Sequence, residues 1–305
     1  MRPIFERFPR VRDRVRFEPL VELPTPVTEH RGIWVKRDDR IGGGKYRKLE
    51  FYHPPGDLVA WGPEGSNWLR AVARVKRQVR IYTYPQHHNP HSLLNVPHIP
   101  AKRCRDYLEW GVRMLGELPR VVGGRTTLVP LGGSTPETTL GFVNAALELA
   151  GQVERKECPR PDAVFVPLGT CGTVAGLALG FRLAGLDVPI HAVRVGVPMT
   201  ARLRNVWGLA SQAAWLLDAR PALTRIVLER GYYRGYGVPI PEGTEAQDFF
   251  HPLDLDETYS AKAAACLLAR RPAYRTPFFW LTYGGTPAGN LRLREPFGGV
   301  GGSSG

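Results

Sequence analysis

The sequence predicts an α/β fold built on parallel sheets. Short apolar runs alternate with longer amphipathic ones along the chain, which is the pattern of consecutive βαβ units. Glycine-rich junctions separate several of these runs, among them residues 42–44 and 169–172. The chain has 305 residues, of which 43% are hydrophobic and 23% charged. That length and composition fit one large domain or two of ordinary size with buried cores.

Apolar runs bounded by turn residues are predicted as strands at 32–36, 57–61, 79–84, 126–129, 163–167, 190–194 and 277–281. The amphipathic segments predict helices at 45–52, 67–77, 103–117, 137–151, 173–184, 199–207, 210–217 and 257–270. Residues 85–100 are rich in Pro, His and Asn and are interpreted as a surface loop. Their histidines are not interpreted as a metal site, because Pro85 and Pro90 interrupt any helix that would align them.

The charge of the chain is strongly basic, with 41 Lys and Arg residues against 28 Asp and Glu, a formal net charge of +13. Such an excess first suggests a partner that carries phosphate, such as a nucleic acid or an anionic membrane. The basic residues are mostly Arg, however, and they are spread along the chain without forming a known nucleic-acid-binding motif. We therefore interpret the charge as a solvated surface and expect neither a nucleic-acid nor a membrane partner.

The four cysteines lie far apart and form no CxxC pair, which favours a reduced, cytoplasmic protein. The first residues alternate charged and apolar side chains and lack the apolar core of a signal peptide. No apolar run approaches the ~20 residues of a membrane-spanning helix. The glycine- and serine-rich residues 296–305 are predicted to be a disordered tail.

A lysine at the start of a predicted helix is the first candidate for covalent chemistry. In the segment RGIWVKRDDRIGGGKYRKLE, residues 31–50, a strand ends in charged residues and three glycines precede Lys45. Glycines let a backbone approach a ligand closely, and a helix start offers unpaired N–H groups to an anion. A desolvated lysine at that point suits Schiff-base chemistry. Taken alone, the segment is more typical of a glycine turn followed by a surface lysine.

A second segment, VFVPLGTCGTVAG at residues 164–176, predicts a phosphate-binding loop between a buried strand and a helix. The loop consists of Gly169, Thr170, Cys171, Gly172 and Thr173. It lacks the Lys-Ser/Thr ending of a P-loop and the spacing of a dinucleotide-binding GxGxxG motif. The alternative is an ordinary βα turn. Cys171 could be a reactive thiol at a helix N-terminus, but we interpret it as a packing residue, because its backbone and not its sulfur would face the phosphate. A separate lysine and phosphate loop together favour pyridoxal phosphate as the cofactor.

The block PTPVTEHRGIWVKRDDRIGGGKYRKLE, residues 24–50, resembles the opening block of a group of pyridoxal-phosphate enzymes, the 1-aminocyclopropane-1-carboxylate deaminases and D-cysteine desulfhydrases. The resemblance covers nearly the whole chain. It implies a two-domain, three-layer αβα fold of the tryptophan-synthase-β-like type (fold type II). The large cofactor-binding domain would hold residues 1–46 and 152–305, and the small domain residues 47–151. A small amino-acid substrate and a homodimer are implied as well.

The resemblance also implies roles for individual residues. Lys45 would be the lysine bonded to the cofactor and the base at Cα. Ser66 would assist substrate-carboxylate binding and proton transfer, and Asn67 would bond the phenolic oxygen of the cofactor; alone, this pair is typical of a helix N-cap. Gly44 stands where the family usually has Asn, and Trp68 stands where it has His or Gln.

Two later segments, GYGVPIPEG at 235–243 and DETYSAK at 256–262, are similar to family segments that face the substrate. They imply that Tyr236 is a catalytic phenol and that Tyr259 lies beside the substrate. Without the family, these are tyrosines in Pro- and Gly-rich loops.

Three further assignments complete the cofactor site. Ser260 would lie under the pyridine nitrogen, and Lys48 and the loop at 169–173 would bind the cofactor. The segment LTYGGTPA, residues 281–288, matches the closing turn of the family, with Tyr283 in place of its first Thr.

The identity of residue 260 bears on the reaction. A neutral hydroxyl under the pyridine nitrogen favours an unprotonated ring, whereas a carboxylate favours the protonated ring. In the resembled group, the cyclopropane-opening deaminases carry Glu there and the D-cysteine enzymes Thr, so Ser260 favours β-elimination from a D-amino acid, giving ammonia and a 2-oxo acid. Opening of 1-aminocyclopropane-1-carboxylate stays open as an alternative. So does a non-catalytic protein that binds a cofactor or nucleic acid.

Overall fold

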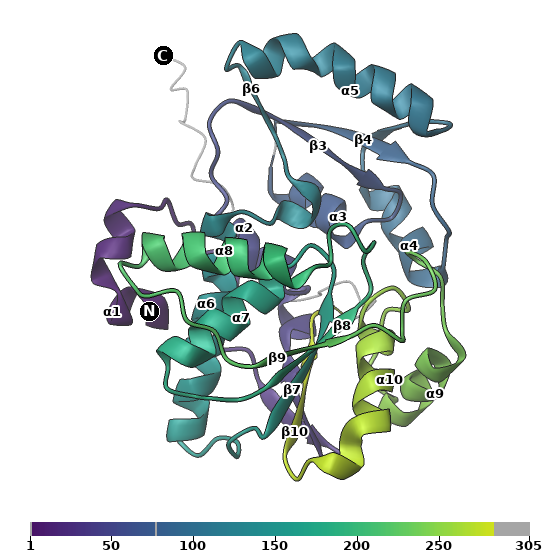
Figure 1. The fold of residues 1–305 in the computed structure, drawn as a ribbon. Helices are drawn as coiled ribbons and strands as arrows, with labels where there is room; N and C mark the ends of the chain where they lie inside the picture. The colour runs from purple at the N-terminus through teal and green to yellow at the C-terminus, as the bar shows by residue number, and fades with distance from the viewer. Residues whose placement is uncertain (1, 77, 284–305) are drawn as a thin grey trace, which may run out of the picture.

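The computed structural model describes residues 2–76 and 78–283, which form two sheets (Figure 1). The larger sheet has six strands in the order β1-β2-β10-β7-β8-β9. Only β1 pairs antiparallel to its neighbour; the other pairs are parallel. In that order the strands are β1 (Val27–His30), β2 (Ile33–Arg37), β10 (Pro277–Leu281), β7 (Ala163–Leu168), β8 (Ile190–Arg194) and β9 (Ile226–Glu229).

The smaller sheet has four parallel strands in the order β5-β4-β3-β6. They are β5 (Ala101–Arg103), β4 (Val79–Tyr84), β3 (Asp57–Pro63) and β6 (Thr126–Leu128). Helix α3 (Asn67–Val75) and helix α5 (Tyr107–Val122) pack on this sheet from opposite sides, and the short α4 (Pro90–Asn95) follows β4 (Figure 1).

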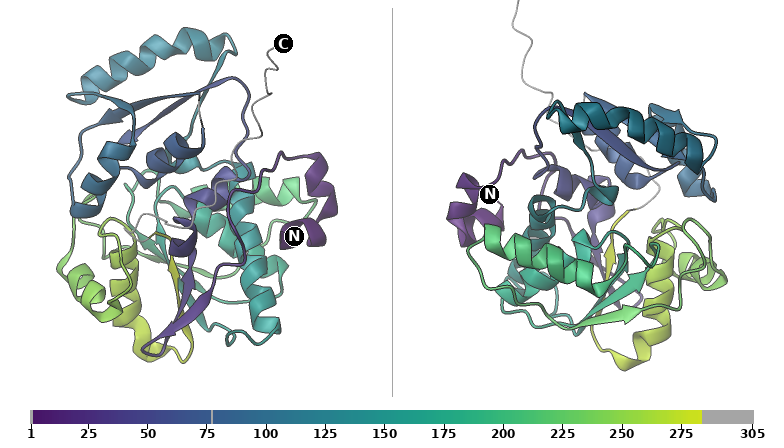
Figure 2. Two further views of the ribbon diagram at one scale, coloured as in Figure 1. Left: turned by 180° about the vertical axis from the view of Figure 1, so that it is seen from behind. Right: turned by 45° about the horizontal axis from the view of Figure 1, so that its top comes forward.

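Helices cover both faces of the larger sheet, as Figure 2 shows from two further sides. Along β7 the side chains alternate: Val164 and Val166 pack in the core toward one set of helices, and Phe165 packs in the core toward the other. The first set is α1 (Pro3–Arg7), α6 (Pro136–Glu154), α7 (Gly172–Leu183) and α8 (Leu203–Leu216), and the second is α9 (Pro241–Phe250) and α10 (Ser260–Arg270). The predicted α/β fold with parallel sheets is thus confirmed.

The structure corrects two predictions of secondary structure. Residues 85–100 are not simply a loop, because α4 forms there behind a capping box in which Asn89 and Ser92 each bond the other's backbone N–H. The helices predicted at 199–207 and 210–217 are one helix, α8, which continues through Gly208. The unpredicted strands β1, β5 and β9 all lie at sheet edges, where short and partly exposed strands lack a continuous apolar run.

The predicted division into domains of residues 1–46 with 152–305 and of residues 47–151 stays a prediction. Helix α6, assigned by that division to the small domain, packs against α7 and α8 of the larger sheet. The predicted tail at 296–305 and residues 284–288 of the predicted closing turn lie outside the described residues. Over residues 2–76 and 78–283, none of the helices is both long and apolar enough to cross a membrane.

Candidate active site

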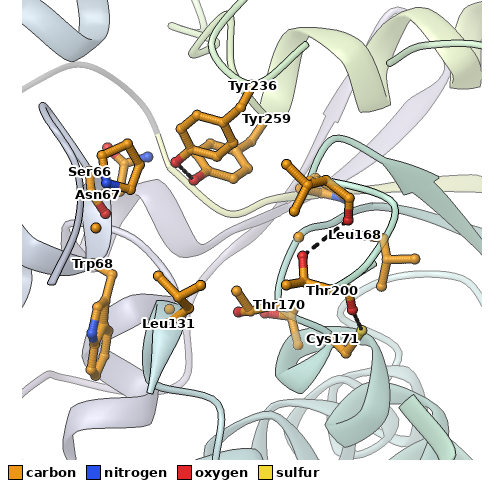
Figure 3. Close-up of a pocket in the computed structure, with 18 of the residues that line it drawn as sticks. Ser66, Asn67, Trp68, Leu131, Leu168, Thr170, Cys171, Thr200, Tyr236 and Tyr259 are labelled. Carbon is orange, nitrogen blue, oxygen red and sulfur yellow. Dashed lines mark hydrogen bonds between the residues drawn. The ribbon is translucent and has the colours of Figure 1, made fainter. Parts of the chain in front are cut away.

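A cavity of about 380 Å³ opens at the carboxyl ends of strands from both sheets (Figure 3). Its lining includes Pro63 at the end of β3, Leu168 at the end of β7, and Tyr283 just after β10. The carboxyl ends of parallel strands are where open α/β sheets bind their ligands. This cavity is therefore the candidate ligand site of the protein.

Lys45 is the first residue of α2 (Lys45–Leu49) and lines the cavity. The turn before it needs glycine: Gly42 and Gly43 have φ of 76° and 107°, and a Cβ at Gly43 would lie 2.8 Å from the carbonyl oxygen of Thr282. The N–H of Gly44 donates to that same carbonyl over 2.7 Å. Burial lowers the pKa of Lys45 to about 8, although the carboxylate of Asp256 acts in the opposite direction. A substantial fraction of this lysine is thus neutral near pH 8.

Gly44, the departure from the family's Asn, has a structural reason. A Cβ built on Gly44 would lie 2.6 Å from Cζ of Phe142, which belongs to α6. The ring of Phe142 is 1% exposed and fills the space that a side chain at residue 44 would need. The ring of Phe142 therefore occupies the space that glycine leaves free at residue 44.

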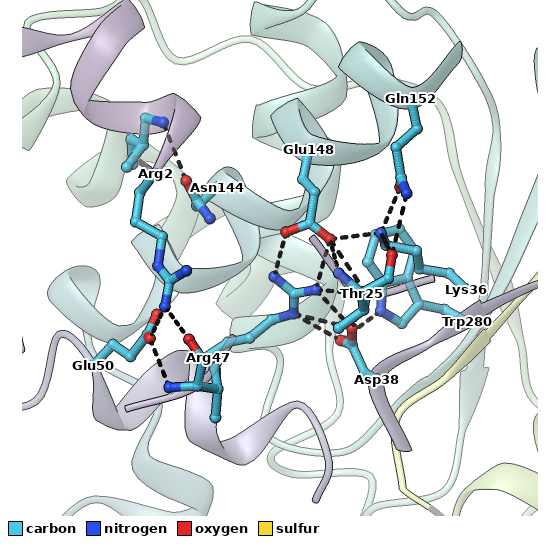
Figure 4. Close-up of polar contacts among 12 residues, drawn as sticks. Arg2, Thr25, Lys36, Asp38, Arg47, Glu50, Asn144, Glu148, Gln152 and Trp280 are labelled. Atoms are coloured by element: carbon cyan, nitrogen blue, oxygen red, sulfur yellow. Dashed lines mark hydrogen bonds and ion pairs between the residues drawn. The ribbon is translucent and has the colours of Figure 1, made fainter. Parts of the chain in front are cut away.

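A cluster of buried charges holds the residues around α2 (Figure 4). The guanidinium of Arg47 donates to the carboxylate of Asp38 over 2.7 Å and to that of Glu148 over 3.1 Å. Lys36 pairs with Glu148 over 2.5 Å and donates to Gln152 over 2.6 Å. Burial alone would raise the pKa of Glu148, but Arg47 and Lys36 lower it to about 2. Since Arg47 lies two residues after Lys45, this cluster anchors the helix that carries the lysine.

The predicted phosphate loop connects β7 to α7, a helix of 12 residues. Gly169, Thr170, Cys171 and Thr173 line the cavity. Cys171 is the N-cap of α7 with φ of 71°, and the sulfur of its buried thiol lies 3.1 Å from the carbonyl oxygen of Thr200 and 3.5 Å from that of Arg202. The sulfur therefore packs against the neighbouring backbone, in line with its interpretation as a packing group.

Lys48 is remote from this loop in the sequence but is connected to it by hydrogen bonds. Its Nζ donates to the carbonyl oxygen of Gly132 over 3.0 Å and to Oγ of Ser134 over 2.9 Å, and Ser134 in turn bonds the hydroxyl of Thr170 over 2.8 Å. Burial, and then the nearby Lys45, hold the pKa of Lys48 well below its ordinary value. A bound anion would raise the pKa of Lys48 and so offset both effects.

The residues present fit a phosphate group. A Cβ added to Gly172 would lie 2.9 Å from both Nζ of Lys48 and Oγ of Ser134, so the absence of a side chain there keeps the cradle open. The donors are an ammonium group, two hydroxyls and the N-terminus of α7, all of which suit an anion.

Ser66 and Asn67 stand at the start of α3 and line the opposite side of the cavity (Figure 3). Ser66 is the N-cap, and its Oγ accepts from the N–H of Leu69 over 3.5 Å. Trp68 is 2% exposed; its indole lies against Gly133, where a Cβ would be 2.1 Å away. Figure 3 shows the indole pointing away from Tyr236 and Tyr259. Its bulk is thus accommodated largely by the missing side chain of Gly133.

Tyr236 and Tyr259 meet at the cavity with their hydroxyls hydrogen-bonded to each other (Figure 3). Tyr236 lies between Gly235 and Gly237, which have φ of 129° and 77° and shape this loop. Burial raises the pKa of both phenols, so both are protonated at neutral pH. Two neutral phenols can pass one proton between them and the cavity.

Ser260 lies behind the cavity wall, next to Tyr259. Its hydroxyl lies 2.6 Å from Oδ2 of Asp256 and 3.0 Å from the carbonyl oxygen of Tyr283. Asp256 also accepts the N–H groups of Tyr259 and Ser260, and burial raises its pKa. The neutral hydroxyl expected at residue 260 is therefore in direct contact with a buried carboxyl group, which sequence reasoning did not identify.

Most of the predicted site residues come together in this one cavity: Lys45, Ser66, Asn67, Gly169, Thr170, Cys171, Thr173, Tyr236 and Tyr259. Lys48, Gly172 and Ser260 lie directly behind its lining. Sequence reasoning missed Ser134, Thr200, Asn95, Arg70 and the aromatic wall of Trp61, Tyr84 and Tyr107. Among the residues that the structure describes, no group of three or more His, Cys, Asp or Glu side chains is placed to hold a metal ion.

Comparisons with known proteins give a matching sequence family and similar curated proteins. Residues 111–276 match the sequence family described as pyridoxal-phosphate dependent enzyme. The D-cysteine desulfhydrases of two Klebsiella pneumoniae strains are each 30% identical over 324 aligned residues, which cover 92% of this chain and 95% of theirs.

Solved structures agree on the fold. A structure described as an ACC deaminase homologue has a TM-score of 0.74 at 22% identity and covers 93% of this chain and 95% of its own. A fungal L-serine ammonia-lyase from Rhizomucor miehei has a TM-score of 0.58 at 16% identity, covering 88% of this chain and 95% of its own. At these identities the likeness concerns the fold alone, and it confirms the predicted fold class.

Proposed function

Because this chain belongs to the pyridoxal-phosphate-dependent enzymes, we propose that it is a deaminase that eliminates the β-substituent of a small D-amino acid and releases ammonia and a 2-oxo acid. D-cysteine is the first substrate to test, since the D-cysteine desulfhydrases of Klebsiella pneumoniae are 30% identical over 92% of the chain. The observation that carries the proposal is the meeting of Lys45, the loop at 169–173 and two neutral phenols in one cavity.

The cofactor would be held at two ends. Lys48, Ser134 and the N-terminus of α7 would bind its phosphate, and Asn67 would donate to its phenolic oxygen. When bound, pyridoxal phosphate supplies an aldehyde that condenses with amines and a ring that accepts the electron pair released at Cα.

Lys45 is the proposed base that takes the proton from Cα of the substrate. A base works best when its pKa lies near the working pH, and burial brings the pKa of Lys45 down to about 8. Tyr236 and Tyr259 remain protonated, because burial raises the pKa of both. They are the proposed donors of a proton to the leaving β-substituent.

The substrate carboxylate would lie at the start of α3, a helix of nine residues. Ser66 and Asn67 line the cavity there, and the first N–H groups of a helix are unpaired donors that favour an anion. This arrangement would fix Cα between the carboxylate site and Nζ of Lys45, which orients the proton to be removed.

The oligomeric state and the cellular location of the protein belong to the same proposal. A homodimer is proposed on the resemblance of the sequence to the family. A cytoplasmic location is proposed because all four cysteines, Cys104, Cys158, Cys171 and Cys266, are buried free thiols.

The experiment is an assay of ammonia and 2-oxo acid release by protein loaded with pyridoxal phosphate. D-cysteine, L-cysteine and 1-aminocyclopropane-1-carboxylate are compared, with Lys45→Ala as the control. We expect turnover of D-cysteine above the other two and none by the variant. Preferred turnover of 1-aminocyclopropane-1-carboxylate would replace elimination by ring opening, and no turnover of any amino acid would contradict the proposed activity.

A further inference from the structure

We propose that Asn95 is a positioning residue: it orients the side-chain amide of Asn67 so that the Nδ2 donor of Asn67, and not its oxygen, faces the cavity. The inference rests on the proposed function, in which the cavity holds the cofactor. Asn95 is the last residue of α4 and is 1% exposed, whereas Asn67 begins α3 and lines the cavity.

The orientation of Asn95 follows from its two outer partners. Its Oδ1 accepts from Nη1 of Arg70 over 2.8 Å, and a guanidinium can only donate. Its Nδ2 donates to the carbonyl oxygen of Gly65 over 2.9 Å, and a carbonyl can only accept. A rotated amide would place donor against donor and acceptor against acceptor, so only one orientation of Asn95 satisfies both partners.

The orientation of Asn67 follows from that of Asn95. Nδ2 of Asn95 donates to Oδ1 of Asn67 over 2.6 Å, so the oxygen of Asn67 must face Asn95. The Nδ2 group of Asn67 is then the end of the amide that remains for the cavity. A donor at that place suits an oxygen with negative charge, such as a phenolate, whereas an amide oxygen there would repel it.

Tyr283 connects this chain of hydrogen bonds to the larger sheet. Its hydroxyl donates to Oδ1 of Asn95 over 3.1 Å and also contacts Arg70. Burial raises the pKa of Tyr283 to about 12, so the hydroxyl keeps its proton at neutral pH. Oδ1 of Asn95 therefore receives one donor from α3 and one from the segment after β10, and the second reinforces the orientation that Arg70 imposes.

The test uses Asn95→Asp, which keeps the shape of the side chain and an acceptor for Arg70 and Tyr283. It removes both Nδ2 protons, so the amide of Asn67 has to rotate and turn its oxygen to the cavity. In protein loaded with pyridoxal phosphate, we expect the pKa read from the pH titration of the visible cofactor band to rise by about 1 unit. Asn144→Asp is the matched control, because Asn144 is equally buried at 1% exposed, accepts from the N–H of Ile4 and does not line the cavity.

A double-mutant cycle separates positioning from a general effect of the new charge. If Asn95 acts through Asn67, the shift caused by Asn95→Asp is absent in the Asn67→Ala background. An equal shift in both backgrounds, or no shift in either, overturns the proposal.

The orientation can also be measured without cofactor, by NMR hydrogen exchange of the side-chain amides. We expect slow exchange for Asn95, whose amide protons are both hydrogen-bonded, and fast exchange for Asn67. The reverse order overturns the orientation, whatever the cofactor does. A wild-type protein that shows this order but binds no pyridoxal phosphate contradicts the proposed function and leaves the orientation supported.

Discussion

The guanidinium of Arg47 and the carboxylate of Asp38 form an ion pair of 2.7 Å in which neither side chain is exposed. The same guanidinium reaches Glu148, whose second oxygen also binds Lys36. The pair joins α2 to the segment after β2 and, through Glu148, to α6. Lys45 thus stands on a helix that is fixed by charge as well as by packing.

Arg47→Met should destabilise the protein by about 3–5 kcal/mol, because Asp38 would remain buried without a cation and Glu148 would keep only Lys36. The free energy of unfolding in urea measures this. The control is Arg155→Met, since Arg155 pairs with Glu157 at the surface, where the side chains are 56% and 44% exposed. That change should cost less than about 1 kcal/mol. Equal costs for both variants would show that the buried cluster does not anchor α2.

Lys45→Met should stabilise the protein without cofactor. Burial lowers the pKa of Lys45 from 10.5 to about 8, so below pH 8 the fold holds a charge that the unfolded chain solvates better. Partial exposure reduces the effect, and we expect a gain of about 1–2 kcal/mol. Between pH 8 and 10.5 the unfolded state binds the extra proton, so wild-type stability rises and the difference between the proteins shrinks. Denaturant unfolding at pH 7 and pH 10 checks this, and a constant difference would contradict it.

Lys48→Gln should weaken the binding of pyridoxal phosphate by about 10- to 100-fold, the value of one charge-assisted contact. Pyridoxal, which lacks the phosphate, provides the matched ligand, and its affinity should change less than about threefold. Fluorescence titration of both ligands checks the prediction. An equal loss for both ligands would mean that Lys48 supports the fold of the cavity and does not bind the phosphate.

Gly44→Asn, which restores the residue usual in the family, should destabilise this protein by about 1–3 kcal/mol, because a Cβ there meets Phe142 at 2.6 Å. Phe142→Leu in the same chain should recover part of the loss by vacating that space. Thermal unfolding of the two single variants and the double variant measures the coupling. Strict additivity of the two changes would contradict the account of residue 44.

The elements that sequence patterns predicted best are the buried strands. The predicted bounds of β4, β8 and β10 agree with the structure, since each is a short apolar run between turn residues. Helix α4 escaped prediction because its composition is typical of a loop, although Asn89 and Ser92 carry a capping signal. Local sequence patterns therefore predict a short helix of this composition only weakly.

Local sequence patterns likewise predicted some residues of the candidate site and missed others. The local glycine patterns around Lys45 and Gly172 were enough to indicate a lysine turn and an anion loop. Ser134 and Asn95 carry no local signal, because their importance comes from contacts with Lys48 and Asn67 that are remote in sequence. Only the fold distinguishes these two residues from the other serines and asparagines of the chain.

The most direct test of the central claim is the visible spectrum of the purified protein with pyridoxal phosphate, before and after borohydride, for wild type, Lys45→Ala and Lys48→Ala. We expect a band in wild type that borohydride abolishes, with the cofactor then found covalently on Lys45 by mass spectrometry of peptides. Lys45→Ala should form no such band, and Lys48→Ala should form it at higher cofactor concentration. Reduction of the cofactor onto any other lysine, or the absence of a reducible band in wild type, would contradict the claim that Lys45 is the centre of this site.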